Sequence, residues 1–369
     1  DNFYLIDEQI RTARRHLPKG YSLELPSLAD GASAGLPRVY DIALETIAHG
    51  DGRVAPDSLS SFVTAYQTFT PLRLGELWAI PIMLRLALIE NLRRIAVRIA
   101  AGVADRDLAV DWADKLTLIA HRDPKNLVLV IADMARSDPP MSTSFVSELA
   151  RRLQGRGPTL ALPLTWIEQQ LAESGLNIEQ LVRAGNQQQA AEQVSVSNSI
   201  GSLRLLANID WREFVEAMSV VERTLRTDPG NAYAAMDFAS RDRYRHVIEE
   251  VARDSGLSEA AVAGHAIELA RLAAVRLPDD HRTGHVGYYL IDRGRLDLEG
   301  TTEARVSPVA ILRRLAARFP LQLYLGAVSF ITLLLSTGLL AEARANGSPD
   351  WILPVLGILA LLATSQLAV

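Results

Sequence analysis

The sequence predicts an all-α protein in which a multi-helix body is followed by a two-helix transmembrane hairpin. The body is predicted by apolar residues that recur at helical spacing along most of the chain, while alternating β patterns are scarce. The hairpin is predicted by residues 321–341 and 351–369, which contain no Asp, Glu, Lys, Arg or His. Each stretch is long enough to cross a hydrocarbon core of roughly 30 Å at about 1.5 Å per helical residue.

The clearest helical pattern in the body begins near residue 75. Apolar residues at Leu84, Leu88, Leu92, Ile95 and Ile99 follow one another at intervals of four, four, three and four, so they share one face of a helix. The preceding apolar run at 75–89 contains charged residues that make it too short for a membrane span, and we expect it to form a buried helix that a proline kinks.

Capping and glycine signals predict where individual helices begin and end. Helix starts are expected where Asp, Ser or Thr precedes a proline, because a proline at the first helical position loses no hydrogen bond. These dipeptides lie at 70–71, 123–124, 138–139, 228–229 and 307–308, and a capping box is expected at 165–168. Helix ends are expected near Gly102, Gly175, Gly185 and Gly256.

Two glycine-rich segments, 31–35 and 155–158, are candidate breaks in the body. We place a domain boundary at the second one. The predicted organisation is therefore an N-terminal helical domain (1–157), a second helical domain (158–320), a first span (321–341), an extracytoplasmic turn (342–350) and a second span (351–369).

Basic residues predict how the hairpin is oriented. Arg313, Arg314 and Arg318 precede the first span, and positive charge is retained on the cytoplasmic side. The body is therefore expected in the cytoplasm. Because the chain starts at Asp1 rather than Met and stops directly after the second span, we expect a fragment of a longer protein.

Composition narrows the class of protein. A formal net charge of -5 and a pI near 5.9 argue against a nucleic-acid partner, which usually requires a basic face. The chain has no cysteine, so disulfides and thiolate metal sites are excluded. The first twenty residues contain no apolar h-region, and we expect no secretory signal peptide.

One short segment concentrates charge on a predicted helix and is the candidate interaction cluster. Its members are Arg241, Asp242, Arg243, Arg245 and His246. Such a group can hold phosphate or carboxylate, but we favour pairing of Arg241 and Arg245 with acids at helical spacing, such as Asp237, Asp242 and Glu249. An Arg followed by four residues and a His is also the minimal signature of HEPN-type helical ribonucleases, which leaves RNA cleavage as an alternative.

Two further patterns resemble metal sites. His281 and His285 lie four residues apart beside Asp279 and Asp280, but Gly284 argues against the helix that a metal site would need. We expect a loop there, followed by Tyr288 and Tyr289 packed near the membrane surface.

The other pattern is Asp105-Arg106-Asp107, which has the spacing that glycosyltransferases use for a divalent cation. It is expected to open a helix over 108–121, where acidic side chains favour the helix dipole. We therefore assign no catalytic, cofactor-binding or metal-binding residue in this chain.

Several long blocks of the sequence resemble one family. They lie at 2–10, 17–20, 70–94 (TPLRLGELWAIPIMLRLALIENLRR), 197–204, 210–222, 236–246 and 285–292 (HVGYYLID). Together they resemble the N-terminal region of cyclic β-1,2-glucan synthases, which are very large bacterial membrane glycosyltransferases. Long ungapped blocks in one order are more specific than any short motif.

The resemblance implies a parent enzyme of the bacterial inner membrane that polymerises glucose from UDP-glucose and closes the chain to a ring. It also implies that the transferase module, with its Asp-x-Asp and Gln-x-x-Arg-Trp elements and a divalent cation, lies downstream of this region. None of the family's catalytic residues can be transferred to a position in this chain.

We therefore expect this region to anchor and scaffold the synthase. Its partners would be the lipid bilayer and the downstream transferase module, which the candidate interaction cluster would contact. A non-enzymatic membrane adaptor is the remaining alternative.

Overall fold

The computed structural model describes residues 2–16, 24–173, 175–305, 320–345 and 358. Over these residues the chain is helical and contains no β-strand, only an isolated bridge between Ser27 and Pro37, so the all-α prediction is confirmed. The chain divides into two compact units, Asp1–Thr227 (unit 1) and Asp228–Val369 (unit 2). The boundary expected at residue 157 lies between two helices of unit 1, and it stays a prediction.

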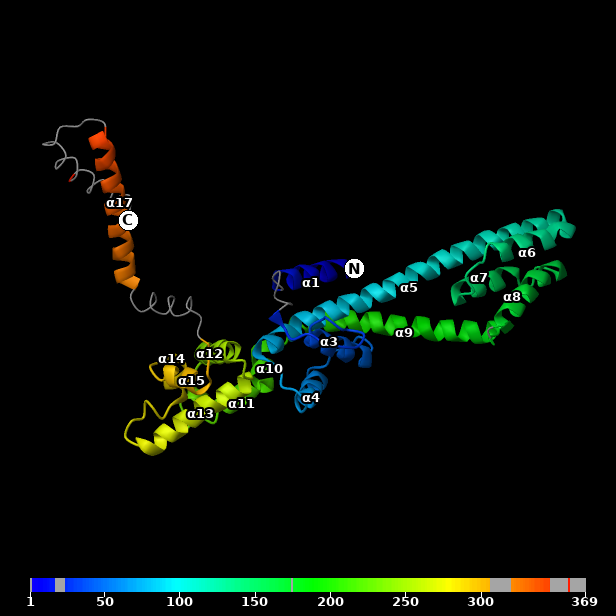
Figure 1. Cartoon of the computed structure of the whole chain (residues 1–369). Helices are drawn as coiled ribbons and strands as arrows, with labels where there is room; N and C mark the ends of the chain where they lie inside the picture. The colour runs from blue at the N-terminus through cyan, green and yellow to red at the C-terminus, as the bar shows by residue number, and fades with distance from the viewer. Residues whose placement is uncertain (1, 17–23, 174, 306–319, 346–357, 359–369) are drawn as a thin grey trace. The chain divides into compact units, whose positions relative to one another are not determined.

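Unit 1 is built around two long helices, α5 (Leu74–Arg122) and α9 (Ile178–Leu205), which lie side by side in Figure 1. Within the described part of unit 1, the other α-helices are α1 (Phe3–His16), α3 (Arg38–His49), α4 (Pro56–Gln67), α6 (Leu127–Arg136), α7 (Thr143–Leu153), α8 (Ala161–Glu173), α10 (Trp211–Met218) and α11 (Val220–Leu225). Two short 3-10 helices, η1 (Pro124–Asn126) and η2 (Pro158–Leu160), precede α6 and α8.

Helix α5 connects two separate hydrophobic cores. Its first half packs with α3, α4 and α10 in a core that includes Leu77, Leu84 and Leu88. Its second half packs with α6, α7 and α8 in a core that includes Ala113 and Leu116. On the apolar face predicted for this helix, Leu84, Leu88 and Ile95 are buried and Leu92 is partly buried, whereas Ile99, between the two cores, is 49% exposed.

The prediction that helices end at Gly102 and Gly185 is wrong, because both residues lie inside long helices. An added Cβ at Gly185 would overlap the Cγ2 of Thr143, and one at Gly102 would lie 2.9 Å from the Oγ of Ser144. These glycines therefore allow the first turn of α7 to approach α5 and α9 closely. Gly256 does end a helix, in the left-handed conformation with φ of 74°.

The predicted helix starts are only partly correct. Pro124 opens η1 as expected, but α5 begins at Leu74 rather than Pro71, and α7 begins after Ser142, whose Oγ accepts from Phe145 N. The helix expected over 108–121 does not begin there, because α5 is continuous through Asp105. Thr165 lies within α8 rather than at a capping box, and its Oγ1 donates to Ala161 O.

A buried ion pair secures the start of α5. Glu76 is fully buried, and its carboxylate accepts hydrogen bonds from Nε and Nη2 of Arg38, each at 2.6 Å. The same carboxylate accepts from Arg73 N at 2.9 Å and thereby caps the helix. The hydrogen bond to Glu76 raises the pKa of Arg38, so the guanidinium stays charged.

Unit 2 contains a compact group of helices and one separate apolar helix. The compact group consists of η3 (Tyr233–Ala235), α12 (Phe238–Ser255), α13 (Glu259–Arg276), α14 (Val286–Ile291) and α15 (Arg295–Thr301). Helix α12 packs against α13 and α14, and α14 packs against α15. Ile248, Ala266, Leu290 and Leu298 are fully buried within this group.

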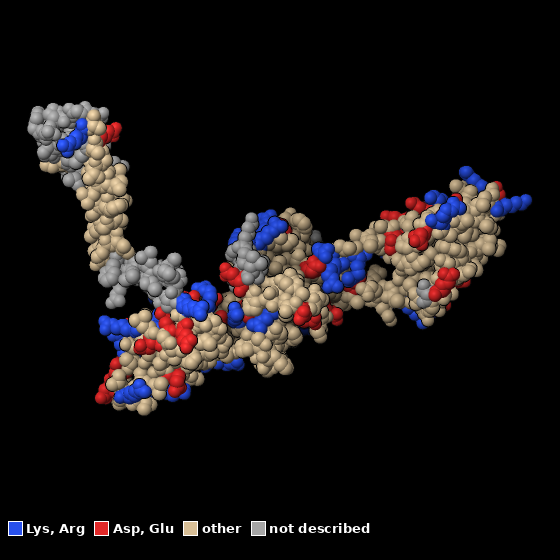
Figure 2. Space-filling model, viewed as in Figure 1, with Lys and Arg blue, Asp and Glu red and all other residues tan. Residues whose placement is uncertain are grey.

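The separate helix is α17 (Pro320–Ala345), which contains the first predicted span and continues beyond its expected end at residue 341. Its window Leu321–Gly338 is long and apolar enough to cross a membrane, and only 11% of the window is buried. Figure 2 shows charged side chains on this helix only at its far end, where Glu342 and Arg344 lie.

The other parts of the predicted hairpin lie outside the described residues. These are the basic group Arg313, Arg314 and Arg318, most of the turn, and the second span apart from Ile358. The two-helix arrangement of the hairpin therefore stays a prediction.

Candidate functional site

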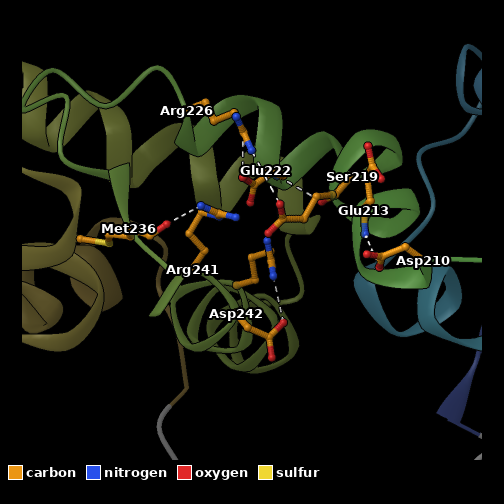
Figure 3. A network of polar contacts seen from close by, with 10 residues as sticks. Asp210, Glu213, Ser219, Glu222, Arg226, Met236, Arg241 and Asp242 are labelled. Atoms are coloured by element: carbon orange, nitrogen blue, oxygen red, sulfur yellow. Dashed lines mark hydrogen bonds and ion pairs between the residues drawn. The ribbon is translucent and has the colours of Figure 1, made fainter. Parts of the chain in front are cut away.

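The candidate interaction cluster lies on α12, which Asp237 caps by accepting from Ser240 N at 2.8 Å. Helical geometry distributes the cluster over two faces. Arg245 is buried, with Nη2 donating to Asp242 Oδ1 at 3.1 Å, and Nη1 of Arg241 donates to Met236 O (Figure 3). The predicted pairing of Arg245 with Asp242 is thereby confirmed.

The other two members of the cluster point outward. The side chain of His246 is 60% exposed, and its Nδ1 lies 2.9 Å from Asp242 O, while Arg243 is also exposed. The five residues therefore do not form one continuous cationic surface. Arg241 and His246, the pair that a HEPN-type ribonuclease would use, each have a hydrogen-bond contact with a backbone carbonyl.

A second charged group shown in Figure 3 belongs to unit 1. Glu222 of α11 is buried and accepts from Arg226 Nε at 2.9 Å, and Ser219 caps this helix by accepting from Glu222 N at 3.1 Å. Asp210 caps α10 in the same way by accepting from Glu213 N. These contacts satisfy helix ends, and they hold the short helices of this region in place.

The most developed polar site in unit 2 is one that the sequence did not predict. The sequence predicts that Asp228 starts a helix together with Pro229. In the structure, the Asp228 side chain instead accepts hydrogen bonds from three groups. Its carboxylate lies 2.6 Å from Nδ1 of His285, 2.9 Å from Val286 N and 3.4 Å from Tyr233 N. A single buried side chain thus joins η3 to the start of α14.

The contact with Asp228 fixes the tautomer and the orientation of the His285 imidazole ring. Because Nδ1 faces a carboxylate at 2.6 Å, that nitrogen carries the proton, and Nε2 faces Tyr244 Oη at 3.5 Å. Gly287 is required for this approach, since an added Cβ there would overlap Oη of Tyr244. The result is a fixed row of carboxylate, imidazole and phenol.

The pKa shifts at this site follow from burial and hydrogen bonding. Burial disfavours the charged form of Asp228, but the hydrogen bonds from His285, Val286 and Tyr233 outweigh it, and the pKa of Asp228 lies below its usual range. Burial, together with the charge of Asp228, raises the pKa of Tyr244. The phenol is therefore neutral at physiological pH.

A depression of about 510 Å³ opens beside this row, and we refer to it as the unit 2 depression. Its lining combines aromatic, charged and glycine residues: Gly230, Ala232, Tyr244, His281, Arg282, His285, Gly287, Tyr288, Ile291 and Asp292. Arg282 donates from Nε at 3.0 Å and from Nη2 at 2.6 Å to Oδ2 of Asp292, which lowers the pKa of Asp292.

The loop predicted around His281 and His285 is present, since both residues precede α14. Tyr289 is buried and Tyr288 is partly exposed in the depression. Within the described ranges, no group of three His, Cys, Asp or Glu side chains is arranged to hold a metal ion. Asp105 accepts from Ser142 Oγ at 2.6 Å and so serves a helix contact.

Sequence reasoning missed Asp228 and Tyr244 as parts of one site. The available signal was the Pro229-Gly230 pair after Asp228, which is more typical of a turn than of a helix start, together with Gly287 beside two tyrosines. Their combination depends on contacts between residues 57 positions apart in the chain.

Over the residues that the structure describes, these features define an all-helical protein with one helix of membrane-spanning length and composition. No family model matches it. It is 34% identical over 303 residues, 81% of its length, to the cyclic beta-(1,2)-glucan synthase NdvB of Rhizobium meliloti (strain 1021), so the predicted resemblance is confirmed. The match covers 10% of the length of NdvB.

Proposed function

We propose that this chain is the N-terminal region of a cyclic β-1,2-glucan synthase and that it anchors and scaffolds the enzyme at the bacterial inner membrane. The observation that carries the proposal is the 34% identity to NdvB over 303 residues. Support for the anchor comes from α17, which is uncharged over its first twenty-two residues, 320–341, and largely exposed. Unit 1 and the compact helices of unit 2 would then lie on the cytoplasmic side, before the first span.

In this proposal the transfer chemistry belongs to a module that follows the chain. That module would take glucose from UDP-glucose with the help of a divalent cation, and this region would hold it at the cytoplasmic surface. No residue of the present chain is assigned to catalysis. The lipid bilayer and the downstream module would be its partners.

The outward face of α12 is the candidate contact with that module. Arg243 and His246 are exposed there, whereas Arg245 is buried and has a structural role. Arg243→Ala combined with His246→Ala in the full-length synthase should lower cyclic glucan output without lowering the amount of protein. Arg276→Ala, at another exposed position of the same unit, is the matched control, and equal output from both variants would remove this contact from the proposal.

The direct test of the family assignment is the reading frame that follows Val369 in the gene. A glycosyltransferase module with Asp-x-Asp and Gln-x-x-Arg-Trp elements should be encoded there. A frame that encodes no such module would contradict the proposal and would favour a membrane adaptor. Neither that alternative nor the HEPN-type ribonuclease is favoured by the similarity to NdvB.

The anchor can be tested because the chain contains no cysteine, so that one introduced cysteine is a unique label. Ala345→Cys, at the exposed end of α17, should react with a membrane-impermeant maleimide applied from the periplasmic side. Ser137→Cys, exposed in unit 1, should react only after the cells are lysed. Labelling of both positions before lysis, or of neither, would refute the proposed topology.

A further inference from the structure

We propose that the unit 2 depression is a saccharide-binding site that takes a segment of β-1,2-linked glucan. This inference rests on the proposed function, because the product of the parent enzyme defines the ligand class. It adds a residue-level site to a region proposed above as an anchor and scaffold. The residues that carry it are Tyr288, Tyr244, His285 and the Arg282–Asp292 pair.

The charge of the depression favours a neutral ligand. Arg282 is paired with Asp292 at 2.6 Å, and Nδ1 of His285 is paired with Asp228 at the same distance. A phosphate would have to compete with two carboxylates for these two donor groups, whereas a hydroxyl group can donate to a carboxylate and accept from a guanidinium at once. A polyol therefore matches the paired acids and bases better than a phosphate or a carboxylate ligand.

The shape and aromatic content of the depression fit a sugar ring. Its volume of about 510 Å³ lies within the roughly 300–1,000 Å³ typical of small-molecule sites. Tyr288 presents a partly exposed ring with a polar end, which suits a ligand that has apolar C–H faces and a rim of hydroxyl groups. The rings of Tyr288 and Tyr289 are held edge to face with centroids 5.2 Å apart, so the orientation of Tyr288 is constrained.

The polar wall of the depression is fixed before any ligand arrives. Asp228 holds His285 in one tautomer, and Gly287 leaves the space in which Tyr244 and His285 approach each other. A wall whose side chains are already ordered loses little conformational entropy on binding. Pre-organisation of this kind is typical of binding sites.

Isothermal titration calorimetry on the full chain, in a detergent without a sugar head group, tests the proposal. The probe is a linear β-1,2-glucooligosaccharide, with maltooligosaccharide and UDP as comparison ligands. We expect the β-1,2 oligosaccharide to bind and Tyr288→Ala to raise its Kd by roughly tenfold, which corresponds to about 1.4 kcal/mol. Tyr288→Phe keeps the ring and should stay within about twofold of the wild-type Kd, a difference below about 0.5 kcal/mol.

Two further variants separate binding from folding. Ala232→Trp places a large side chain at the exposed edge of the depression, outside the core, and should abolish binding. Tyr4→Ala, at a position 83% exposed in unit 1, is the matched tyrosine control and should leave the Kd unchanged. Circular dichroism confirms that each variant keeps its helix content.

Absence of oligosaccharide binding, or unchanged binding by both Tyr288→Ala and Ala232→Trp, would overturn the saccharide site. Binding of UDP alone would overturn it as well, in favour of a phosphate ligand. The proposed function fails separately, if the reading frame after Val369 encodes no transferase. Saccharide binding by a chain that no transferase follows would contradict the proposed function alone. A following transferase without saccharide binding would contradict the saccharide site alone.

Discussion

Removal of the Asp228 carboxylate should loosen unit 2 and leave unit 1 intact. The side chain is nearly fully buried, and it accepts from Val286 N at 2.9 Å and from Tyr233 N at 3.4 Å as well as from His285. Asp228→Ala leaves both backbone donors buried without an acceptor. An unsatisfied buried donor costs about 1–3 kcal/mol. Because the hydrogen bond from Tyr233 N is long, its loss counts at the lower end of this range, and we expect the free energy of unfolding of unit 2 to fall by about 2–4 kcal/mol.

Asp228→Asn tests whether the hydrogen bonds or the charge carry this effect. The amide oxygen can still accept from Val286 N, and the amide nitrogen can donate to Nδ1 of His285 if the imidazole proton moves to Nε2. The contacts with Val286 and His285 are then kept. The amide nitrogen takes the place of Oδ2, however, and cannot accept from Tyr233 N, so this long hydrogen bond is lost together with the charge. We expect this variant to lose about 1–2 kcal/mol, less than Asp228→Ala.

Hydrogen exchange measured by mass spectrometry on the full chain reports the free energy of local opening. Peptides that contain η3 and the start of α14 should exchange faster in Asp228→Ala, while peptides from α5 should be unchanged. Asp279→Ala, at an exposed position of the same unit, is the control and should shift stability by no more than about 0.5 kcal/mol. If Asp228→Ala behaved like this control, or if Asp228→Asn were the more damaging variant, the assignment of Asp228 as the central acceptor would be refuted.

The same carboxylate predicts a pH dependence. Since the pKa of Asp228 is lowered in the folded state, its contribution to stability is complete above the unfolded value of about 3.9 and is lost as the pH falls through the folded value. Unit 2 should therefore open in acid below about pH 4. In Asp228→Asn this part of the acid sensitivity should disappear when the exchange of the α14 peptides is measured at several pH values, and an unchanged acid profile would contradict a lowered pKa of Asp228 in the folded state.

Three further predictions concern the framework. Arg38→Met leaves the fully buried Glu76 without its partner and should lower the free energy of unfolding by about 3–5 kcal/mol, measured by thermal or denaturant unfolding. Arg38→Met combined with Glu76→Leu should cost clearly less, because no buried charge is left unpaired. Equal losses in the two variants would argue against a buried charge. Gly185→Ala should destabilise unit 1 by about 1–3 kcal/mol through overlap with Cγ2 of Thr143, and the addition of Thr143→Ser, which removes that methyl group, should reverse the loss if the contact is correctly placed. Phe330→Arg places a charge at the centre of α17 at a cost of about 2.5–3.5 kcal/mol for insertion and should reduce maleimide labelling of the reporter cysteine at residue 345; unchanged labelling would mean that this helix does not insert.

The sequence was sufficient for the helical class because periodicity is a local property. It was less informative about where helices end. Gly102 resembles a break, yet glycine inside a helix costs only about 1 kcal/mol relative to alanine, and the close approach of α7 compensates for that cost. This compensation depends on Ser144, more than forty residues away, and no local pattern contains that information.

The site shows the same limit more clearly. The spacing of Asp242 and Arg245 is helical, and it predicts their pairing correctly. Asp228 resembles a helix cap because it precedes a proline, which is a local signal, whereas its true partner is His285 in another element. The residues that line the depression come from separate segments of the chain, so they could be recognised singly but not as one site.

The two cores of unit 1 differ in how much of the chain must be synthesised before each core is complete. The core around Ala113 draws its buried residues from one uninterrupted stretch between Ala109 and Leu171, so it can consolidate soon after that stretch leaves the ribosome. The core around Leu77 incorporates Leu203 and Val215, which are synthesised long after α3 and α4. During synthesis, the core around Leu77 would therefore stay incomplete while the core around Ala113 folds. The apolar surfaces of α3 and α4 would need protection from premature association until α9 and α10 are synthesised.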